Sequence, residues 1–253
     1  MKSQSPNAPD WLTARPIAHR GLHDSTKGRV ENSIAAAEAA IAQNYAIECD
    51  VQISKDGEAV VFHDFSLERL TMAQGNVDHF SAEELQKIAY RDGAGAPPPL
   101  TSFLAAIAGR TPLIIEIKSR FDGDHRLAAR TVAAVAGYTG PVALKSFDID
   151  VLRVVRKAAV ACPVGFIGEA HYEHEDWTPL SDATKAVLTD FSFYPEIQPD
   201  FLSWSARDLP HAVPRLCRDG IGMPVMAWTI RSPEERTRVS PFADQIVFEG
   251  FAA

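Results

Sequence analysis

Residues 46–53 read AIECDVQI and residues 113–118 read LIIEIK, and these two stretches decide the fold and place its chemistry. Both are short apolar runs of the kind that form buried strands. Side chains two residues apart on a strand point to the same face. Glu48 and Asp50 therefore share one face of the first strand, and Glu116 and Lys118 share one face of the second. Charges are rarely buried unless they are paired or bind a metal. The two stretches therefore indicate a charged site within a core built from strands.

Apolar runs of this kind alternate with helix-like stretches along the chain. Strands are expected at Arg15–His19, Ala46–Ile53, Leu113–Lys118, Val142–Phe147, Val164–Gly168, Phe201–Ser205, Val225–Ile230 and Gln245–Glu249. Helices are expected at 33–43, 81–89, 101–109, 124–136, 149–159, 181–193, 211–220 and 233–239. Alternating strands and helices predict a parallel sheet covered by helices, and eight such strands close best as a TIM-type (β/α)8 barrel of the α/β class. We expect one domain over residues 1–253, with a hairpin strand at Ala59–His63 after the second strand and no closing helix after the eighth.

Composition excludes several classes of function. The chain has 253 residues, 46% hydrophobic content, a formal net charge of -8 and a pI of about 5.5. An acidic protein is a poor default binder of nucleic acid or of anionic membranes. No apolar run approaches the length of a membrane span, and the polar start of the chain does not read as a secretory signal. Three scattered cysteines fit a reducing compartment, so a cytoplasmic protein is expected.

In a barrel of this type, catalytic residues lie at the carboxyl ends of the strands. The candidates His19, Glu48 with Asp50, Glu116 with Lys118, and Trp228 all stand late in their strands. Three carboxylates are oxygen ligands, which suit Mg²⁺ or Ca²⁺ rather than Zn²⁺. The alternative is a structural cluster held by salt bridges.

The other candidates also have two interpretations. His19 and His63 are either a general acid–base pair or hydrogen-bonded core residues. Arg20 either binds a phosphate with its planar fork or pairs with a neighbouring glutamate. Lys118 either holds a phosphate or balances Glu116, and Trp228 either lines a substrate pocket or only packs. His23, His171 and His174 read as solvated loop residues.

These motifs together make the chain resemble the glycerophosphodiester phosphodiesterase family, which has a phosphatidylinositol-phosphodiesterase-like TIM barrel. The resemblance runs from Pro16 to about Glu249 and is densest up to Lys118. It rests on the stretches IAHRG (17–21), ENS (31–33), IECDV (47–51), SKDG (54–57), VVFHD (60–64), LERLT (67–71), LIIEIK (113–118), SF (146–147) and AWT (227–229).

The resemblance implies one divalent cation, Mg²⁺ or Ca²⁺, held by Glu48, Asp50 and Glu116. It also implies that His19 and His63 transfer protons, that Arg20 and Lys118 bind the phosphate, and that the substrate is a small glycerophosphodiester. We expect a cytoplasmic hydrolase of lipid and glycerol metabolism that forms sn-glycerol 3-phosphate and an alcohol, with His63 as base and His19 as acid. The alternatives are lysophospholipase D-like or phosphoinositide-cleaving activity on the same scaffold, or a non-catalytic relative that only binds phosphodiesters.

Two departures from the family pattern raise further expectations. Family members often carry an Asp-bearing segment after the last strand, where this chain has Phe248-Glu249-Gly250. Without a closing helix, the flank of that strand needs cover, and we expect the N-terminal segment Pro6–Thr13 or a second subunit in a homodimer to supply it. The loop Glu169–Trp177 carries no recognisable motif and is a candidate for substrate selection.

Overall fold

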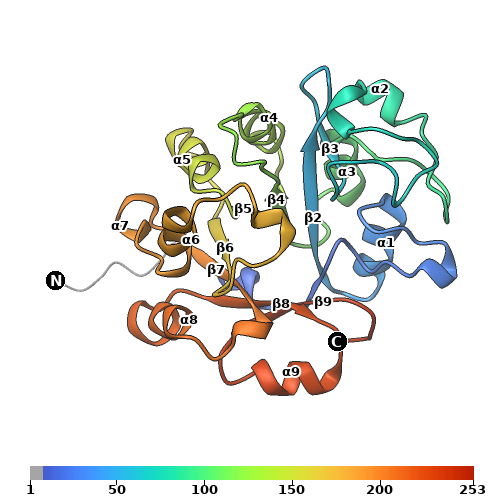
Figure 1. Cartoon of the computed structure of the whole chain (residues 1–253). Helices are drawn as coiled ribbons and strands as arrows, with labels where there is room; N and C mark the ends of the chain where they lie inside the picture. Colours follow the sequence, from blue (N-terminus) through green and yellow to red (C-terminus); the bar gives the residue numbers. More distant parts are fainter. Residues whose placement is uncertain (1–7) are drawn as a thin grey trace.

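The computed structural model describes residues 8–253, and eight parallel strands in it close into a barrel (Figure 1). The barrel strands are β1 (Ile17–Ala18), β2 (Ala46–Ile53), β4 (Leu113–Ile117), β5 (Val142–Ser146), β6 (Val164–Gly168), β7 (Phe201–Ser205), β8 (Val225–Ile230) and β9 (Gln245–Phe248). Neighbouring strands pair in sequence order, and β1 closes the ring by pairing with both β2 and β9. The predicted (β/α)8 barrel is confirmed.

Helices surround the ring, as Figure 1 shows. They are α1 (Ile34–Ala42), α2 (Ala82–Leu85), α3 (Leu100–Ile107), α4 (Arg126–Val135), α5 (Ile149–Lys157), α6 (Asp182–Thr189), α7 (Tyr194–Ile197), α8 (Ala212–Arg215) and α9 (Pro233–Val239). Two of the helix starts follow directly from sequence. Ser33 caps α1 by accepting a hydrogen bond from the Ala36 amide, and Ser81 with Glu84 forms a capping box at α2.

The predicted helix over 181–193 is interrupted. The chain turns at Phe191, whose φ of 56° lies in the left-handed region, and α7 starts again at Tyr194. The predicted helix over 211–220 is also shorter, because after α8 it continues as a five-residue π-helical turn, Leu216–Gly220.

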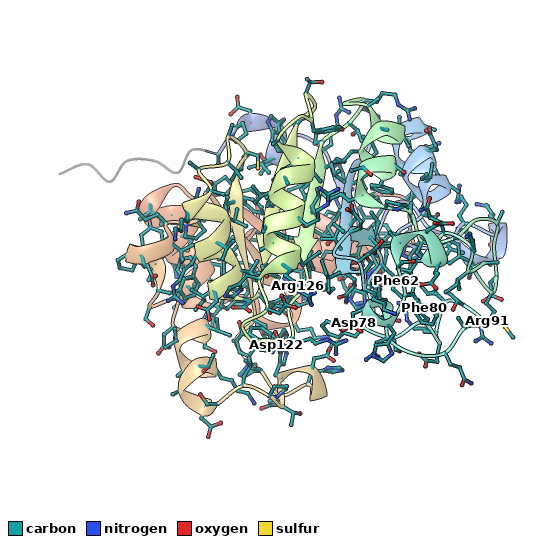
Figure 2. The ribbon with its side chains drawn as sticks, turned by 90° about the horizontal axis from the view of Figure 1, so that it is seen from above. Phe62, Asp78, Phe80, Arg91, Asp122 and Arg126 are labelled. Carbon is teal, nitrogen blue, oxygen red and sulfur yellow. The ribbon has the colours of Figure 1, made fainter. Side chains whose placement is uncertain are left out.

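An extra strand, β3 (Ala59–Val61), pairs antiparallel with the end of β2, so the predicted hairpin is confirmed. The segment that follows β3 has its own small core, which includes Val60, Phe62, Leu67 and Leu85. Figure 2 shows this segment beside the loop that follows β4, with Asp78 near Asp122 and Arg126. Arg120 joins the two, since its guanidinium lies 3.7 Å from Asp78 and 4.1 Å from the centre of the Phe65 ring.

Side chains on the two faces of the barrel strands belong to two different hydrophobic clusters. The outward-facing residues, such as Ile47, Cys49 and Val51, pack against the helices in the main hydrophobic core. A smaller cluster fills the interior at the amino ends of the strands and contains Leu12, Ile17, Ala46, Ile114, Ala143, Phe201, Met226 and Val247. The carboxyl ends of the same strands are thereby left for polar side chains.

The described residues give the last strand a cover that the sequence did not predict, and a second subunit in a homodimer stays a prediction. In its described part, the N-terminal segment sends Leu12, which is 1% exposed, into the amino end of the barrel. Thr13 of the same segment accepts a hydrogen bond from Gln245 of β9 at 2.7 Å. Tyr45 and Phe251 also cover β9, since their rings lie 4.8 and 5.5 Å from the Phe248 ring. The Tyr45 hydroxyl also donates to the Ala253 carbonyl at 2.9 Å, which holds residues 250–253 beside β9. Pro6 lies outside the described residues. No helix within residues 8–253 is both long and apolar enough to cross a membrane.

Candidate active site

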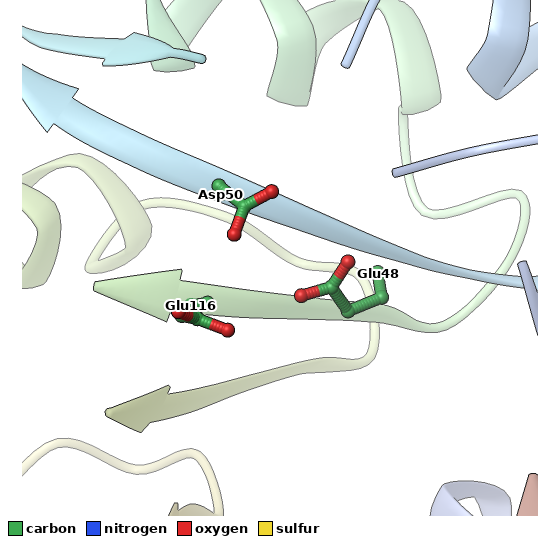
Figure 3. A group of neighbouring side chains, drawn as sticks. All are labelled: Glu48, Asp50 and Glu116. Atoms are coloured by element: carbon green, nitrogen blue, oxygen red, sulfur yellow. The ribbon is translucent and has the colours of Figure 1, made fainter. Parts of the chain in front are cut away.

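The three carboxylates identified in the sequence lie together at the carboxyl end of the barrel. β2 and β4 pair in register, with Asp50 opposite Glu116, so Glu48, Asp50 and Glu116 point to one face. Figure 3 shows all three carboxyl groups directed into the same space. One oxygen of each lies within 4.8 Å of the others, and the three residues are at most 6% exposed. Buried oxygens at this spacing fit a hard divalent cation.

Lys118 and Arg20 partly neutralise this cluster. Lys118 Nζ lies 2.7 Å from Glu116 and 3.1 Å from Asp50, and Arg20 Nε lies 3.4 Å from Asp50. Burial works to raise the pKa of Asp50, but Lys118, His63 and Arg20 outweigh it and hold that pKa well below its usual range. The carboxylate is therefore ionised and available as a ligand.

A third cation, Lys145, was missed in the sequence. It lies on β5 and is 3% exposed, with Nζ 3.0 Å from Glu48 Oε1 and 3.7 Å from Glu116 Oε2. The sequence did indicate it, because the rule that identified the carboxylates, that a charge in an apolar strand is paired or functional, also applies to a lysine there. Glu48 Oε1 is buried and has the Lys145 ammonium as its charged partner. With Arg20 and Lys118, three cations balance three carboxylates.

Local backbone geometry fixes the residues around Asp50 and Glu48. Arg20 and Asn32 both have left-handed φ angles, of 54° and 56°. The Arg20 amide donates to Glu48 Oε2 at 3.1 Å. Asn32 makes two hydrogen bonds with Asp50: Asn32 Nδ2 donates to Asp50 Oδ2 at 2.9 Å, and Asn32 Oδ1 accepts from the Asp50 amide at 3.1 Å. Gly21 is required beside them, because a Cβ there would lie 2.9 Å from the Cβ of Ala36. The sequence analysis places Asn32 only in the family-like stretch ENS (31–33).

His19 stands at the end of β1 and is oriented by Glu249. Its Nδ1 lies 2.5 Å from Glu249 Oε2, and Arg231 Nε donates to the other oxygen at 2.8 Å. Burial works to raise the pKa of Glu249, but its contacts with His19 and His23 hold that pKa far below the usual range. An ionised carboxylate only accepts hydrogen bonds, so Nδ1 of His19 is the protonated nitrogen in this contact.

Glu249 and His23 were misjudged in the sequence. Glu249 had been read as a departure from the family pattern, yet it is the partner of His19. His23 had been read as a solvated loop residue, but its Nε2 is buried and lies 3.7 Å from Glu249. His171 and His174 are exposed, as expected.

His63, the other candidate for proton transfer, has a similar arrangement. Its Nδ1 lies 2.7 Å from Asp64 Oδ1, and Arg69 Nε donates to Asp64 Oδ2 at 2.6 Å. Arg69 also donates to Glu31 at 2.7 and 2.8 Å, and Glu31 in turn accepts from Arg20 at 2.6 Å. Burial opposes the ionisation of Glu31, but the two arginines lower its pKa to about 2. This charged chain fixes Arg20 and His63 relative to each other.

Trp228 is half-buried, with Nε1 donating to the Ser203 carbonyl at 3.1 Å and the ring 5.6 Å from that of Phe147. Both interpretations made from the sequence are thus compatible with its place near the barrel end.

The sequence matches the Glycerophosphoryl diester phosphodiesterase family over residues 19–245. The chain belongs to this family. A glycerophosphodiester phosphodiesterase of Caldanaerobacter subterraneus subsp. tengcongensis is 33% identical over 161 residues, which cover 60% of this chain and 65% of that relative. The matched part of the chain thus spans just under two thirds of this relative's length.

Solved structures of family members share the fold. An Oleispira antarctica phosphodiesterase, solved with the product sn-glycerol-3-phosphate, has a TM-score of 0.74 at 21% identity over 94% of both chains. The glycerophosphodiester phosphodiesterase of Thermotoga maritima has a TM-score of 0.70 at 22% identity over 92% of both chains. At these identities the likeness establishes the barrel, and the residues above carry the functional argument.

Proposed function

We propose that this family member is a metal-dependent phosphodiesterase that hydrolyses glycerophosphodiesters to sn-glycerol 3-phosphate and an alcohol. The observation that carries the proposal is the buried triad Glu48, Asp50 and Glu116, surrounded by cations at the catalytic end of the barrel. The family match and the product bound by the Oleispira antarctica enzyme support the same reaction class.

The triad would hold one Mg²⁺ or Ca²⁺. Three carboxylates and three cations are close to electrical balance, so a divalent cation would give the site a surplus of positive charge for an anionic phosphodiester. When bound, such an ion polarises the phosphate and stabilises the charge that develops in the transition state. Arg20 and Lys118 would bind the phosphate oxygens beside it, and Trp228 would contact the substrate.

His63 and His19 would move the protons. Each imidazole has its Nδ1 held by a carboxylate, Asp64 or Glu249, which leaves Nε2 for the substrate. We assign His63 as the base that activates a water or a neighbouring glycerol hydroxyl, and His19 as the acid that protonates the leaving alkoxide.

The test is release of sn-glycerol 3-phosphate from a panel of glycerophosphodiesters by the purified protein. EDTA should abolish release, and Mg²⁺ or Ca²⁺ should restore it. Glu48→Gln should lose activity and metal binding, whereas Glu83→Gln, at an exposed position on α2, should keep both. Full activity in metal-stripped protein, or no product from any substrate, would contradict the proposal.

A further inference from the structure

The carboxylate that orients His19 has a second imidazole beside it. His23 Nε2 lies 3.7 Å from Glu249 Oε2, and the same oxygen contacts His19 Nδ1 at 2.5 Å. Arg231 Nε donates to the other oxygen at 2.8 Å. The reaction proposed above uses His19 as the acid but leaves His23 without a role.

Glu249 needs an anchor other than His19 if it is to hold that imidazole in place. The backbone of the two residues is fixed, because the His19 amide donates to the Phe248 carbonyl at 2.9 Å. The glutamate side chain still rotates about several bonds, and a carboxylate that merely follows the imidazole cannot orient it. The Arg231 side chain is 55% exposed, and exposed ion pairs contribute little to stability. Among the contacts of this carboxylate within residues 8–253, His23 remains as the anchor.

His23 is placed for this contact. Its Nε2 is buried and has no hydrogen-bond partner within the described part of the chain. A buried N–H group without an acceptor destabilises a fold, so the Glu249 carboxylate is the group toward which the ring directs it. A movement of roughly 0.5 Å would bring Nε2 and Oε2 into ordinary hydrogen-bond range.

The turn that carries His23 is tied to β2 and α1. The Gly21 amide donates to the Glu48 carbonyl at 3.2 Å, and the Leu22 amide donates to the Ala36 carbonyl at 3.0 Å. The imidazole therefore stands on anchored backbone, as the positioning of a catalytic group requires.

We propose that His23 is a positioning residue for the general acid His19. Through its Nε2–H it anchors Glu249 Oε2, and the anchored carboxylate holds His19 in the tautomer protonated at Nδ1, with Nε2 available to the leaving oxygen. This inference rests on the proposed function, in which His19 protonates the leaving alkoxide. His23 itself touches neither the substrate nor the metal ligands in this role.

The experiment compares kcat for two leaving groups in the metal-loaded full chain. One substrate is the glycerophosphodiester that the wild type cleaves fastest, and the other is the nitrophenyl ester of sn-glycerol 3-phosphate, whose leaving group needs no acid. His23→Leu removes the Nε2 donor. It should lower kcat for the first substrate by about tenfold with KM nearly unchanged, and the loss should largely disappear for the nitrophenyl ester.

His23→Gln tests the hydrogen bond itself. The glutamine Nε2 can take the place of the imidazole Nε2 and donate instead of it, so this variant should keep kcat within about threefold of the wild type. His23→Asn, whose side chain is too short to reach Oε2, should behave as His23→Leu and serves if the leucine variant does not fold. His79→Leu, at an exposed position, is the matched control and should equal the wild type with both substrates.

Three results would overturn this inference and leave the proposed function standing. They are a wild-type kcat in folded His23→Leu and His23→Asn, an equal loss with both leaving groups, and a His23→Gln variant as slow as His23→Leu. Absence of product from the wild type with either substrate would overturn the proposed function, and this inference with it.

Discussion

Replacing Lys145 with methionine tests whether the buried charges form a metal site. Lys145 is 3% exposed and contacts Glu48 at 3.0 Å and Glu116 at 3.7 Å. Methionine retains an unbranched apolar side chain but removes the positive charge. Glu48 then keeps a buried negative charge without its nearest cation.

Removing one partner of a buried ion pair destabilises a protein by about 3–5 kcal/mol. In a chain of this size, 1 kcal/mol corresponds to a shift in Tm of about 2–4 °C. In EDTA, Lys145→Met should therefore unfold about 6–20 °C below the wild type. A divalent cation at about 100 times its Kd stabilises a protein by about 2.7 kcal/mol. The variant should gain more stability from the metal than the wild type, because the Lys145 ammonium no longer competes with the metal for the carboxylates. The difference in Tm should narrow as metal is added.

The assay is thermal unfolding, followed by circular dichroism, in EDTA and across a titration of Ca²⁺ or Mg²⁺. Lys157→Met, at an exposed position on α5, is the control and should shift Tm by no more than about 2 °C. The reasoning is refuted if Lys145→Met matches the wild type in EDTA, or if its loss of stability is the same at every metal concentration.

Four further outcomes follow from the site and the core. His19→Ala and His63→Ala should each slow turnover by roughly 10²–10⁴-fold, and a substrate with a nitrophenol leaving group should rescue only His19→Ala; the reverse would exchange the two roles. Glu249→Gln should lower kcat at least about tenfold with metal binding by calorimetry unchanged, whereas a normal kcat would contradict its positioning of His19. Leu12→Ala should lower the free energy of unfolding in urea by about 2–5 kcal/mol; no loss would show that Leu12 does not fill the barrel. Because the pKa of Glu169 is raised from 4.5 to about 7, the folded chain binds more protons in that window, so wild-type stability should fall relative to Glu169→Gln as pH rises from 4.5 to 7; a constant difference in Tm would contradict this.

The elements that could be predicted from the sequence are those determined by local pattern. The bounds of β2, β6, β7 and β8 match the predicted strands, because strands buried on both faces read as continuous apolar runs. The triad followed from the same local rule, since two residues on one strand share a face whatever the surroundings. The interruption at Phe191 could not be read in this way, because a left-handed φ at a phenylalanine is set by tertiary packing.

The partners of the site residues depend on which strands are neighbours, and a local pattern does not show this. Glu249 and His19 are 230 residues apart and meet only because β9 pairs with β1 to close the ring. Asn32 reaches Asp50 because Arg20 and Asn32 both adopt left-handed backbone conformations. Lys145 is different, since a buried lysine in a strand could have been identified by the rule that was applied to Glu116.

The strands that pair with β2 bring His19 and His63 to one site beside Asp50. β1 and β3 both pair with the edge of β2 that β4 does not occupy, β1 at its start and β3 at its end, so the segments that carry His19 and His63 meet beside Asp50. Both imidazoles are close enough for their charges to lower the pKa of Asp50. In-line displacement at phosphorus places the attacking and leaving oxygens on opposite sides of the phosphate. The proposed roles require one imidazole beside each of these oxygens, and the contacts of Glu249 and Asp64 with the Nδ1 atoms would leave Nε2 of each ring for that task.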